Sequence, residues 1–264
     1  MDFGLKQKRA LVCASSQGLG KAIALGLAEE GAHLFLCARS TDTLKSVAEE
    51  CLALGAASVE TTQADLSKEA DRNHLIDAIQ KHWPEGPQVV VHNVGGPRPC
   101  KMDEATVEDW RGAFEQLFVS VVHLNHAFLP KMKEHQYGRI LTITSTSAFE
   151  PIPGLALSSG LRPGITAMSK AWADEVAPFN ITMNCIAPGY IYTARTEQRV
   201  KDFMEREGGT KEEHLKRMSG AIPAGRMGDP KELASAAVYL CSDAASYVTG
   251  TTLLVDGSRT RKSV

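Results

Sequence analysis

Short runs of apolar residues alternate along this chain with longer stretches in which apolar residues recur at helical spacing. The runs predict strands at Arg9–Ala14, His33–Ala38, Ser58–Thr62, Gln88–His92, Ile140–Thr144, Ile181–Ile186 and Thr252–Val255. The stretches between them predict helices at about Gly20–Glu30, Thr41–Leu54, Lys68–His82, Val107–His135, Ser158–Ala177 and Pro230–Ser242. Strands that alternate with helices are typical of β-α-β units. The pattern therefore predicts a single α/β domain over residues 1–264, with a doubly wound, mostly parallel sheet of about seven strands.

The segment 195–217 interrupts this alternation and mixes charges of both signs. It is either a solvated pair of helices or a mobile cover over a substrate cleft, hinged near Gly208–Gly209. The sequence leaves both interpretations open.

The composition is that of an ordinary soluble protein: 43% of the residues are hydrophobic, 23% are charged, and the formal net charge is −2. Because the charges nearly balance, neither nucleic acid nor a membrane is an expected partner. No segment approaches the roughly 18 uninterrupted apolar residues of a membrane span, so we expect a cytoplasmic location. The six cysteines and eight histidines show no metal-ligand spacing. We therefore expect reduced thiols and no metal site.

The first predicted strand runs into a turn that contains Gly18 and Gly20 and opens a helix. Glycine lets a pyrophosphate approach the backbone closely, and the helix N-terminus offers N–H groups and a positive dipole end. The alternative is that the glycines only allow close packing of the strand and the helix.

Arg39 stands at the end of the second predicted strand, about where an adenosine ribose would lie. Its guanidinium suits a 2′-phosphate, whereas a carboxylate there would accept hydrogen bonds from a 2′-hydroxyl. This favours NADP(H) over NAD(H), unless Arg39 is an ordinary surface residue.

Ordered motifs along the chain resemble the short-chain dehydrogenase/reductase family, most closely in general pattern the 3-oxoacyl-acyl-carrier-protein reductases. The motifs are ALVCASSQGLGKAIA, Asp65-Leu66, HNVG from His92, GRILTITS ending at Ser145, NCIAPGYIYT and GRMGDPKELASAAVYLCSDAASYVTGTTLLVDG. Together they cover nearly everything from Leu5 to Gly257. The resemblance implies a Rossmann-type fold, an NADP-dependent oxidoreductase activity and a homotetramer.

The resemblance also implies a cofactor site at the ends of several strands, with the pyrophosphate at the glycine turn and the nicotinamide near residues 188–193. The implied residues are Ala14, Ser16, Gln17, Gly18, Leu19, Gly20, Arg39, Ser40, Asp65, Leu66, Asn93, Gly95, Pro188, Gly189, Ile191 and Thr193. One of them departs from the family pattern, because Ala14 replaces its first glycine. Alanine fits there only if its φ is negative. We therefore expect cofactor binding to be weakened rather than abolished.

The family's catalytic residues are a serine, a tyrosine, a lysine four residues after the tyrosine, and an asparagine on the preceding long helix. Ser145 matches the serine, but the family spacing places Ser158 at the tyrosine position, Arg162 at the lysine position and Leu117 at the asparagine position. No tyrosine of this chain is followed four residues later by a lysine. A serine hydroxyl is a far weaker acid than a phenol, and an arginine keeps the charge without carrying a proton.

Three residues near this motif have open interpretations. Pro163 is expected to make the helix start close to Arg162 or kink there, and either would re-aim Ser158. Tyr190 is either a substitute proton donor in the nicotinamide loop or a packing residue. Ser145 is either a catalytic hydroxyl or one that caps a turn.

Three functions are compatible with these residues. The first is an NADP-dependent oxidoreductase that reduces a small-molecule or acyl-carrier-bound carbonyl, such as a 3-oxoacyl thioester, by a non-standard proton transfer. The second is a catalytically silent, nucleotide-binding regulatory or assembly subunit. The third is a non-redox enzyme on the same scaffold. The halohydrin dehalogenases resemble this chain in their arginine, but they give up the nucleotide site, whereas Gly18 and Gly20 are kept here.

Overall fold

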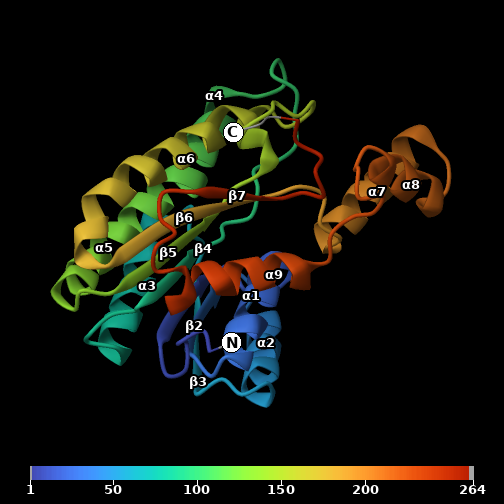
Figure 1. Ribbon diagram of the computed structural model, residues 1–264. Coiled ribbons are helices and arrows are strands. Elements are labelled where there is room, and N and C mark those ends of the chain that lie inside the picture. The colour runs from blue at the N-terminus through green and yellow to red at the C-terminus, as the bar shows by residue number, and fades with distance from the viewer. Residues whose placement is uncertain (1, 262–264) are drawn as a thin grey trace.

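A seven-stranded parallel sheet forms the centre of the computed structural model, which describes residues 2–261 (Figure 1). Its strands are β1 (Arg9–Cys13), β2 (His33–Ala38), β3 (Ser58–Gln63), β4 (Val89–His92), β5 (Gly138–Ile143), β6 (Ile181–Pro188) and β7 (Thr252–Val255). They lie in the order β3-β2-β1-β4-β5-β6-β7, and neighbouring strands pair in parallel. The predicted doubly wound α/β sheet is confirmed.

Helices connect the strands. They are α1 (Gly18–Glu29), α2 (Thr41–Ala53), α3 (Glu69–His82), α4 (Val107–Phe114), α5 (Ser120–Glu134), α6 (Ala156–Val176), α7 (Ala194–Glu207), α8 (Lys211–Gly220) and α9 (Pro230–Leu240). Shorter turns are the π-helical η1 (Glu115–Val119) and the 3-10 turns η2 (Thr146–Ala148), η3 (Ala177–Phe179) and η4 (Asp243–Ala245).

The sheet is buried on both faces, because successive strand residues point to opposite sides. Ala10 and Val12 of β1 belong to a core that α1, α2 and α9 cover. Leu11 and Cys13 belong to a second core under α3, α5 and α6. Figure 1 shows the resulting three layers, with the carboxyl ends of the strands directed to one edge of the molecule.

The helix α6 begins at Ala156, well before Pro163, and continues through the proline to Val176. The expectation that this helix starts close to Arg162 is therefore wrong. A proline removes one helical N–H bond, but Pro163 lies on the exposed side of α6, where water can reach the freed carbonyl. As a result, Ser158 and Arg162 lie one turn apart on a single helix.

The predicted helix Val107–His135 is interrupted by the π turn η1, and Ser120 provides the physical reason. Its N–H donates to the Glu115 carbonyl, one residue further back than in an α-helix. The Ser120 hydroxyl donates a hydrogen bond to the Gln116 carbonyl instead, at 2.6 Å. Gln116 Nε2 in turn donates to the Val94 carbonyl after β4, at 2.6 Å. π turns inserted into α-helices are frequent at functional sites.

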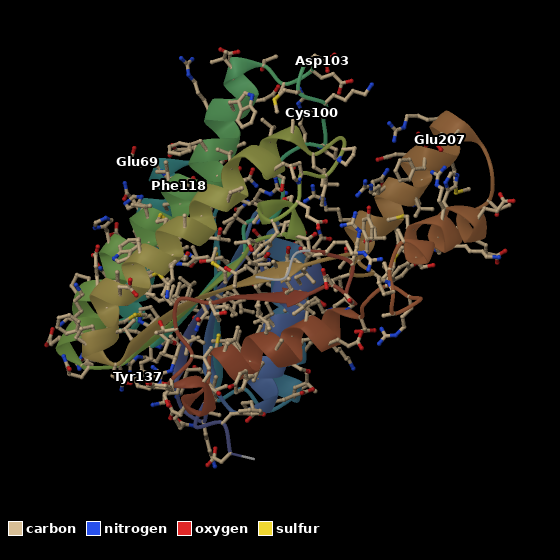
Figure 2. The ribbon with its side chains drawn as sticks, turned by 45° about the horizontal axis from the view of Figure 1, so that its top comes forward. Glu69, Cys100, Asp103, Phe118, Tyr137 and Glu207 are labelled. Carbon is tan, nitrogen blue, oxygen red and sulfur yellow. The ribbon has the colours of Figure 1, made fainter. Side chains whose placement is uncertain are left out.

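The charged segment folds as the helix pair α7–α8, which projects from the body of the molecule in Figure 1. Between the helices, Gly208 and Gly209 have φ of 72° and 85°, a region that favours glycine. Figure 2 shows Glu207, the last residue of α7, on this projecting pair. These glycines form the turn between the two helices, and α7 packs mainly on α8.

Within residues 2–261, no helix is both long enough and apolar enough to cross a membrane. All six cysteines are buried and unpaired. The described part of the chain also contains no group of three or more histidine, cysteine or acidic side chains placed to hold a metal ion.

Candidate active site

The carboxyl ends of β1 and β4 meet where the strand order reverses, since β2 and β3 lie on one side of β1 and β4 to β7 on the other. In open α/β sheets this reversal opens a crevice that binds ligands. Two predicted cofactor residues, Ala14 and Asn93, directly follow these strands. Asn93 Nδ2 donates to the Ala14 carbonyl at 3.2 Å, which ties the two strand ends together.

The first turn of α1 keeps its N–H groups available for an anion. Gln17 is the N-cap residue, but its side chain makes no capping bond, and the first turn carries no acidic residue. Gly18 has a φ of 58°, and a Cβ built on it would have only Thr193 within 4 Å. Ser16 precedes this turn, and Leu19 packs on the core below it. An open backbone at an uncapped helix N-terminus suits a phosphate group.

Gly20 and Ala14 pack against each other beneath this turn. A Cβ on Gly20 would collide with the Ala14 carbonyl, so glycine is required. Ala14 itself adopts a φ of 46°. The condition under which an alanine was expected to fit, a negative φ, is therefore not met. The strand end keeps a left-handed backbone at a cost on the order of 1 kcal/mol.

Arg39 and Ser40 follow β2 as exposed residues, and Asp65 and Leu66 follow β3 beside them. Burial raises the pKa of the Asp65 carboxyl, but hydrogen bonds from Ser67 and the charge of Arg39 lower it more, so that this pKa falls below its usual value. Arg39 thus lies near Asp65 while remaining exposed. An exposed guanidinium at this corner suits a 2′-phosphate.

The loop after β6 lies opposite the α1 turn. A Cβ on Gly189 would lie 2.6 Å from Asp256 Cβ, so the loop approaches β7 closely only because this residue is glycine. Pro188 ends β6, Ile191 is buried, and Thr193 is the N-cap residue of α7. Because Thr193 is also the nearest neighbour of Gly18, this loop faces the α1 turn.

Ser145 follows β5, and its Oγ accepts a hydrogen bond from the Ser147 N–H at 3.1 Å. This is the turn-capping role that the sequence left as an alternative. The Oγ is the acceptor in that bond and the residue is half-buried, so its own hydroxyl hydrogen is available to a ligand. The capping role and a catalytic role are therefore compatible.

Ser158 and Arg162 are bonded to each other on α6. Arg162 Nε donates to Ser158 Oγ at 3.1 Å, and Ser158 Oγ lies 2.8 Å from Ser147 Oγ. The structure thus links Ser158 to Ser147 rather than to Ser145. These contacts form a buried chain of two hydroxyls and one guanidinium.

Arg162 is 6% exposed and donates only to neutral acceptors. Its other donors reach the carbonyls of Ile143 at 3.0 Å and Gly95 at 3.5 Å. Burial, and then the positive charge of Arg195, lower the pKa of Arg162 to about 10. The side chain is still a cation at neutral pH, and it joins α6 to the loops after β4 and β5.

Tyr190 is flanked by two other arginines. The Arg259 guanidinium lies 4.8 Å from the centre of the Tyr190 ring, and that of Arg199 lies 5.8 Å from it. Across residues 2–261, no hydrogen bond joins Tyr190 to Ser145, Ser158 or Arg162. The structure therefore brings Ser158 and Arg162 together but leaves Tyr190 outside their chain of contacts.

Three residues at this site were not predicted from the sequence: Ser147, Gln116 and Arg195. Arg195 Nη2 donates to the Pro97 carbonyl at 3.1 Å. The only signals available were the second serine of the run beginning at Ser145, the amide beside Leu117, and the first arginine after Thr193. None of these signals identifies a partner, because the partners lie on other elements: Ser158 on α6, and Val94 and Pro97 in the loop after β4.

Comparisons with known proteins agree with this geometry. The family model described as enoyl-(acyl carrier protein) reductase matches residues 13–259. The NADPH-dependent reductase BacG of Bacillus subtilis is 32% identical over 254 residues, which cover 96% of this chain and 98% of that protein. The 3-oxoacyl-[acyl-carrier-protein] reductase FabG of Aquifex aeolicus is 30% identical over 257 residues, covering 97% and 99% respectively.

A solved structure with the same fold contains a cofactor and a substrate. L-sorbose reductase from Gluconobacter frateurii, complexed with NADPH and L-sorbose, matches with a TM-score of 0.95 and 30% identity over 100% of both chains. The fold, the glycine turn at the strand switch and these matches lead to one assignment. The chain belongs to the short-chain dehydrogenase/reductase family.

Proposed function

We propose that this protein is an NADP(H)-dependent reductase of a carbonyl compound, with 3-oxoacyl thioesters among its substrates. The observation that carries the proposal is the uncapped N-terminus of α1 at the strand switch, with Gly18 open toward Thr193. BacG and L-sorbose reductase, both named with NADPH, support the cofactor, and FabG supports the 3-oxoacyl substrate.

The residues at the sheet edge fit NADP(H). The α1 turn at Gly18 would hold the pyrophosphate, Arg39 the 2′-phosphate, and Asn93 and Gly95 the ribose. Bound there, NADPH supplies the hydride that reduces the carbonyl carbon. The strained Ala14 adjoins the pyrophosphate position, which is where we expect affinity to be lost.

Ser145, Ser158 and Arg162 would act on the substrate oxygen and the ribose. Ser145 donates its free hydroxyl hydrogen to the carbonyl oxygen, and Arg162 holds the ribose with one of its remaining donors. Ser158 and Arg162 stand in place of the tyrosine and lysine of the family motif. The proton that the reduced oxygen takes up comes from Tyr190 or from a water molecule held by the serines.

Two features of the proposal concern the whole protein. The helix pair α7–α8 serves as the cover of the substrate cleft. The protein is a cytoplasmic homotetramer, in which the exposed apolar side chains of Val107, Phe114, Tyr247 and Leu253 would be covered by neighbouring subunits.

The proposed activity is tested by following NADPH consumption with a panel of 3-oxoacyl thioesters and simple ketones. Removing a donor to a reacting oxygen typically costs about 10²–10³ in kcat, so Ser145→Ala should lose that much. Ser235→Ala, which changes an exposed serine of α9, is the matched control and should keep full activity. Consumption equal in the wild type and Ser145→Ala would overturn the assigned role.

The second candidate is a nucleotide-binding subunit without turnover. It is favoured by the absence of a Tyr-x-x-x-Lys motif and by the contacts of Tyr190, which lie with Arg199 and Arg259. NADPH binding measured by calorimetry, with no consumption on the whole panel, would establish this candidate and exclude the reductase.

A further inference from the structure

We propose that Arg195 and Arg162 form a subsite for an anionic oxyacid group on the organic substrate, a carboxylate or a phosphate. The inference rests on the proposed function, because it names the class of substrate that the same site takes. Its basis is where the two guanidinium groups lie and what surrounds them.

Both guanidinium groups are bound to one short loop after β4. Arg162 Nη2 donates to the Gly95 carbonyl at 3.5 Å, and Arg195 Nη2 donates to the Pro97 carbonyl at 3.1 Å. A Cβ on Gly96, between these two carbonyls, would collide with the Arg195 guanidinium. The glycine thus allows Arg195, from α7, to reach the loop that Arg162 already holds from α6.

Unlike several other arginines in the described part of the chain, these two have no acidic partner there. Arg72 pairs with Glu115, Arg98 with Asp109, and Arg226 with Glu232. By contrast, within residues 2–261 no carboxylate oxygen lies within 4.0 Å of the side-chain nitrogens of Arg162 or Arg195. Arg162 is thus a buried cation that meets only neutral groups and another cation, which is costly, whereas Arg195 is an exposed residue.

The electrostatics follow from this arrangement. The charge of Arg195 lowers the pKa of Arg162, and burial and then Arg199 lower that of Arg195. Arg199 and Arg259 extend the positive region around Tyr190, and Arg259 Nε is buried without a partner in the described chain. An anion placed between Arg162 and Arg195 would replace this repulsion with charge-assisted hydrogen bonds.

The position of the pair points to the substrate rather than to a phosphate of the cofactor. Arg39 follows β2 and the α1 turn follows β1, so they take the 2′-phosphate and the pyrophosphate in the proposed binding mode. The loop at Gly95–Pro97 follows β4, the strand on the other side of β1, so in the proposed binding mode it would lie at the reacting end of the cofactor. An oxyacid group there belongs to the molecule that is reduced.

The test is calorimetric titration of the intact protein loaded with NADP⁺. Acetoacetate and its neutral methyl ester are the first pair of probes, and acetoacetyl thioesters of pantetheine with and without the 4′-phosphate are the second. Losing a charge-assisted hydrogen bond weakens binding by about 10- to 150-fold. We therefore expect the wild type to bind the anionic probe of at least one pair more tightly, and Arg195→Gln to lose at least tenfold for that probe.

Two further variants serve as controls. Arg206→Gln changes an exposed arginine at the other end of α7 and should bind as the wild type does. Arg195→Lys keeps the charge without the bidentate geometry and should be intermediate. If Arg195→Gln does not fold, the affinity of Arg195→Lys for the anionic probe tests the inference in its place.

The outcomes separate the inference from the proposed function. A preference for only the phosphorylated thioester would retain the subsite and assign it to phosphate, whereas a preference for acetoacetate would assign it to carboxylate. The inference is overturned if the wild type does not prefer either anion, if Arg195→Gln binds as the wild type does, or if Arg195→Gln loses NADPH affinity to the same extent. Absence of NADPH consumption would overturn only the reductase, because the calorimetry still decides the subsite.

Discussion

At the scale of single residues, Ala14 shows how a cofactor loop tolerates an unfavourable residue. Its φ of 46° is held by the Asn93 side chain on its carbonyl and by the packing of Gly20 beneath it. Residues other than glycine adopt this region at a cost on the order of 1 kcal/mol. The geometry of the turn is therefore set by its surroundings and not by the residue.

Ala14→Gly should accordingly stabilise the protein by about 0.5–1 kcal/mol in urea unfolding, because it removes the strain. It should also tighten NADPH binding. Ala10→Gly, in the strand β1 that precedes Ala14 and without a positive φ, is the control and should destabilise the protein. A loss of stability in Ala14→Gly as large as in the control would show that the left-handed backbone is not strained.

His92, at the end of β4, makes stability depend on pH. It is buried, its Nε2 lies 2.8 Å from Asn125 Oδ1, and burial lowers its pKa to about 4, although Asn125 raises it slightly. The folded protein therefore keeps His92 neutral between pH 4 and the ordinary value of about 6.5, while the unfolded chain binds a proton there. Stability must fall as the pH falls through this window.

The fall attributable to His92 should approach about 3 kcal/mol as the pH falls from about 7.5 to about 3, below which both states are protonated and no further contribution is expected. His92→Gln removes the titrating group and should lose less stability over the same range. Urea unfolding at several pH values measures this, with His126→Gln, an exposed histidine of α5, as the control. Identical pH slopes in the wild type and His92→Gln would show that His92 does not titrate with unfolding.

The turn at Gly18 and Gly20, which we propose to hold the pyrophosphate, could be predicted from the sequence because its geometry is local. Gly18 and Gly20 stand between a strand and a helix, and the backbone alone makes the site. Ser147 and Arg195 could not be predicted, because their partners Ser158 and Pro97 are distant in sequence. The φ of Ala14 could not be predicted from the sequence either, because the contacts with Asn93 and Gly20 determine it.

At the scale of elements, the strands were predicted closely because most are short apolar runs with clear ends, although β3 (SVETTQ) has a single apolar residue. The π turn η1 was missed, because the Ser120 hydrogen bonds that create it leave the apolar pattern of the helix unchanged. The helical pattern predicted the start of α6 closely, at Ser158 against the observed Ala156, whereas the alternative of a start near Arg162 was wrong because Pro163 lies on the exposed side of the helix. Packing of the buried face of α6 determines where this helix begins.

Pro163 should therefore lower the free energy of unfolding of the protein. Pro163→Ala restores a helical N–H bond and should raise the free energy of unfolding by about 1–3 kcal/mol. Pro230→Ala is the matched control, since Pro230 is the first residue of α9, where proline costs nothing. That variant should be neutral or slightly destabilised. A loss of stability in Pro163→Ala would mean that the proline is required by the shape of α6.

At the scale of the whole molecule, the helix pair α7–α8 is the part with fewest contacts to the sheet and its covering helices. It also carries Arg195, which reaches the active site from the first turn of α7. A ligand bound at that arginine would hold the projecting pair against the body. Loading of the site and closure of the cover are therefore coupled in the proposed mechanism.

Limited trypsin digestion should report this closure. Cleavage after Lys201, Arg206 and Lys211, which are exposed on the pair, should slow several-fold when NADP⁺ and acetoacetate are added together. Cleavage after the exposed Lys68, outside the pair, provides the internal control. Mass spectrometry of the fragments measures both rates, and unchanged cleavage of the pair would argue against its role as a cover.

Every proposed role of the site depends on NADP(H) binding at the sheet edge, which calorimetric titration with NADPH and NADH measures. The wild type should bind NADPH at least tenfold more tightly, about 1.4 kcal/mol, because of the exposed Arg39 guanidinium. Arg39→Gln should bring the two affinities together by weakening NADPH alone. Failure of the wild type to bind NADPH, or equal affinity for NADH, would contradict the assignment of this edge to NADP(H).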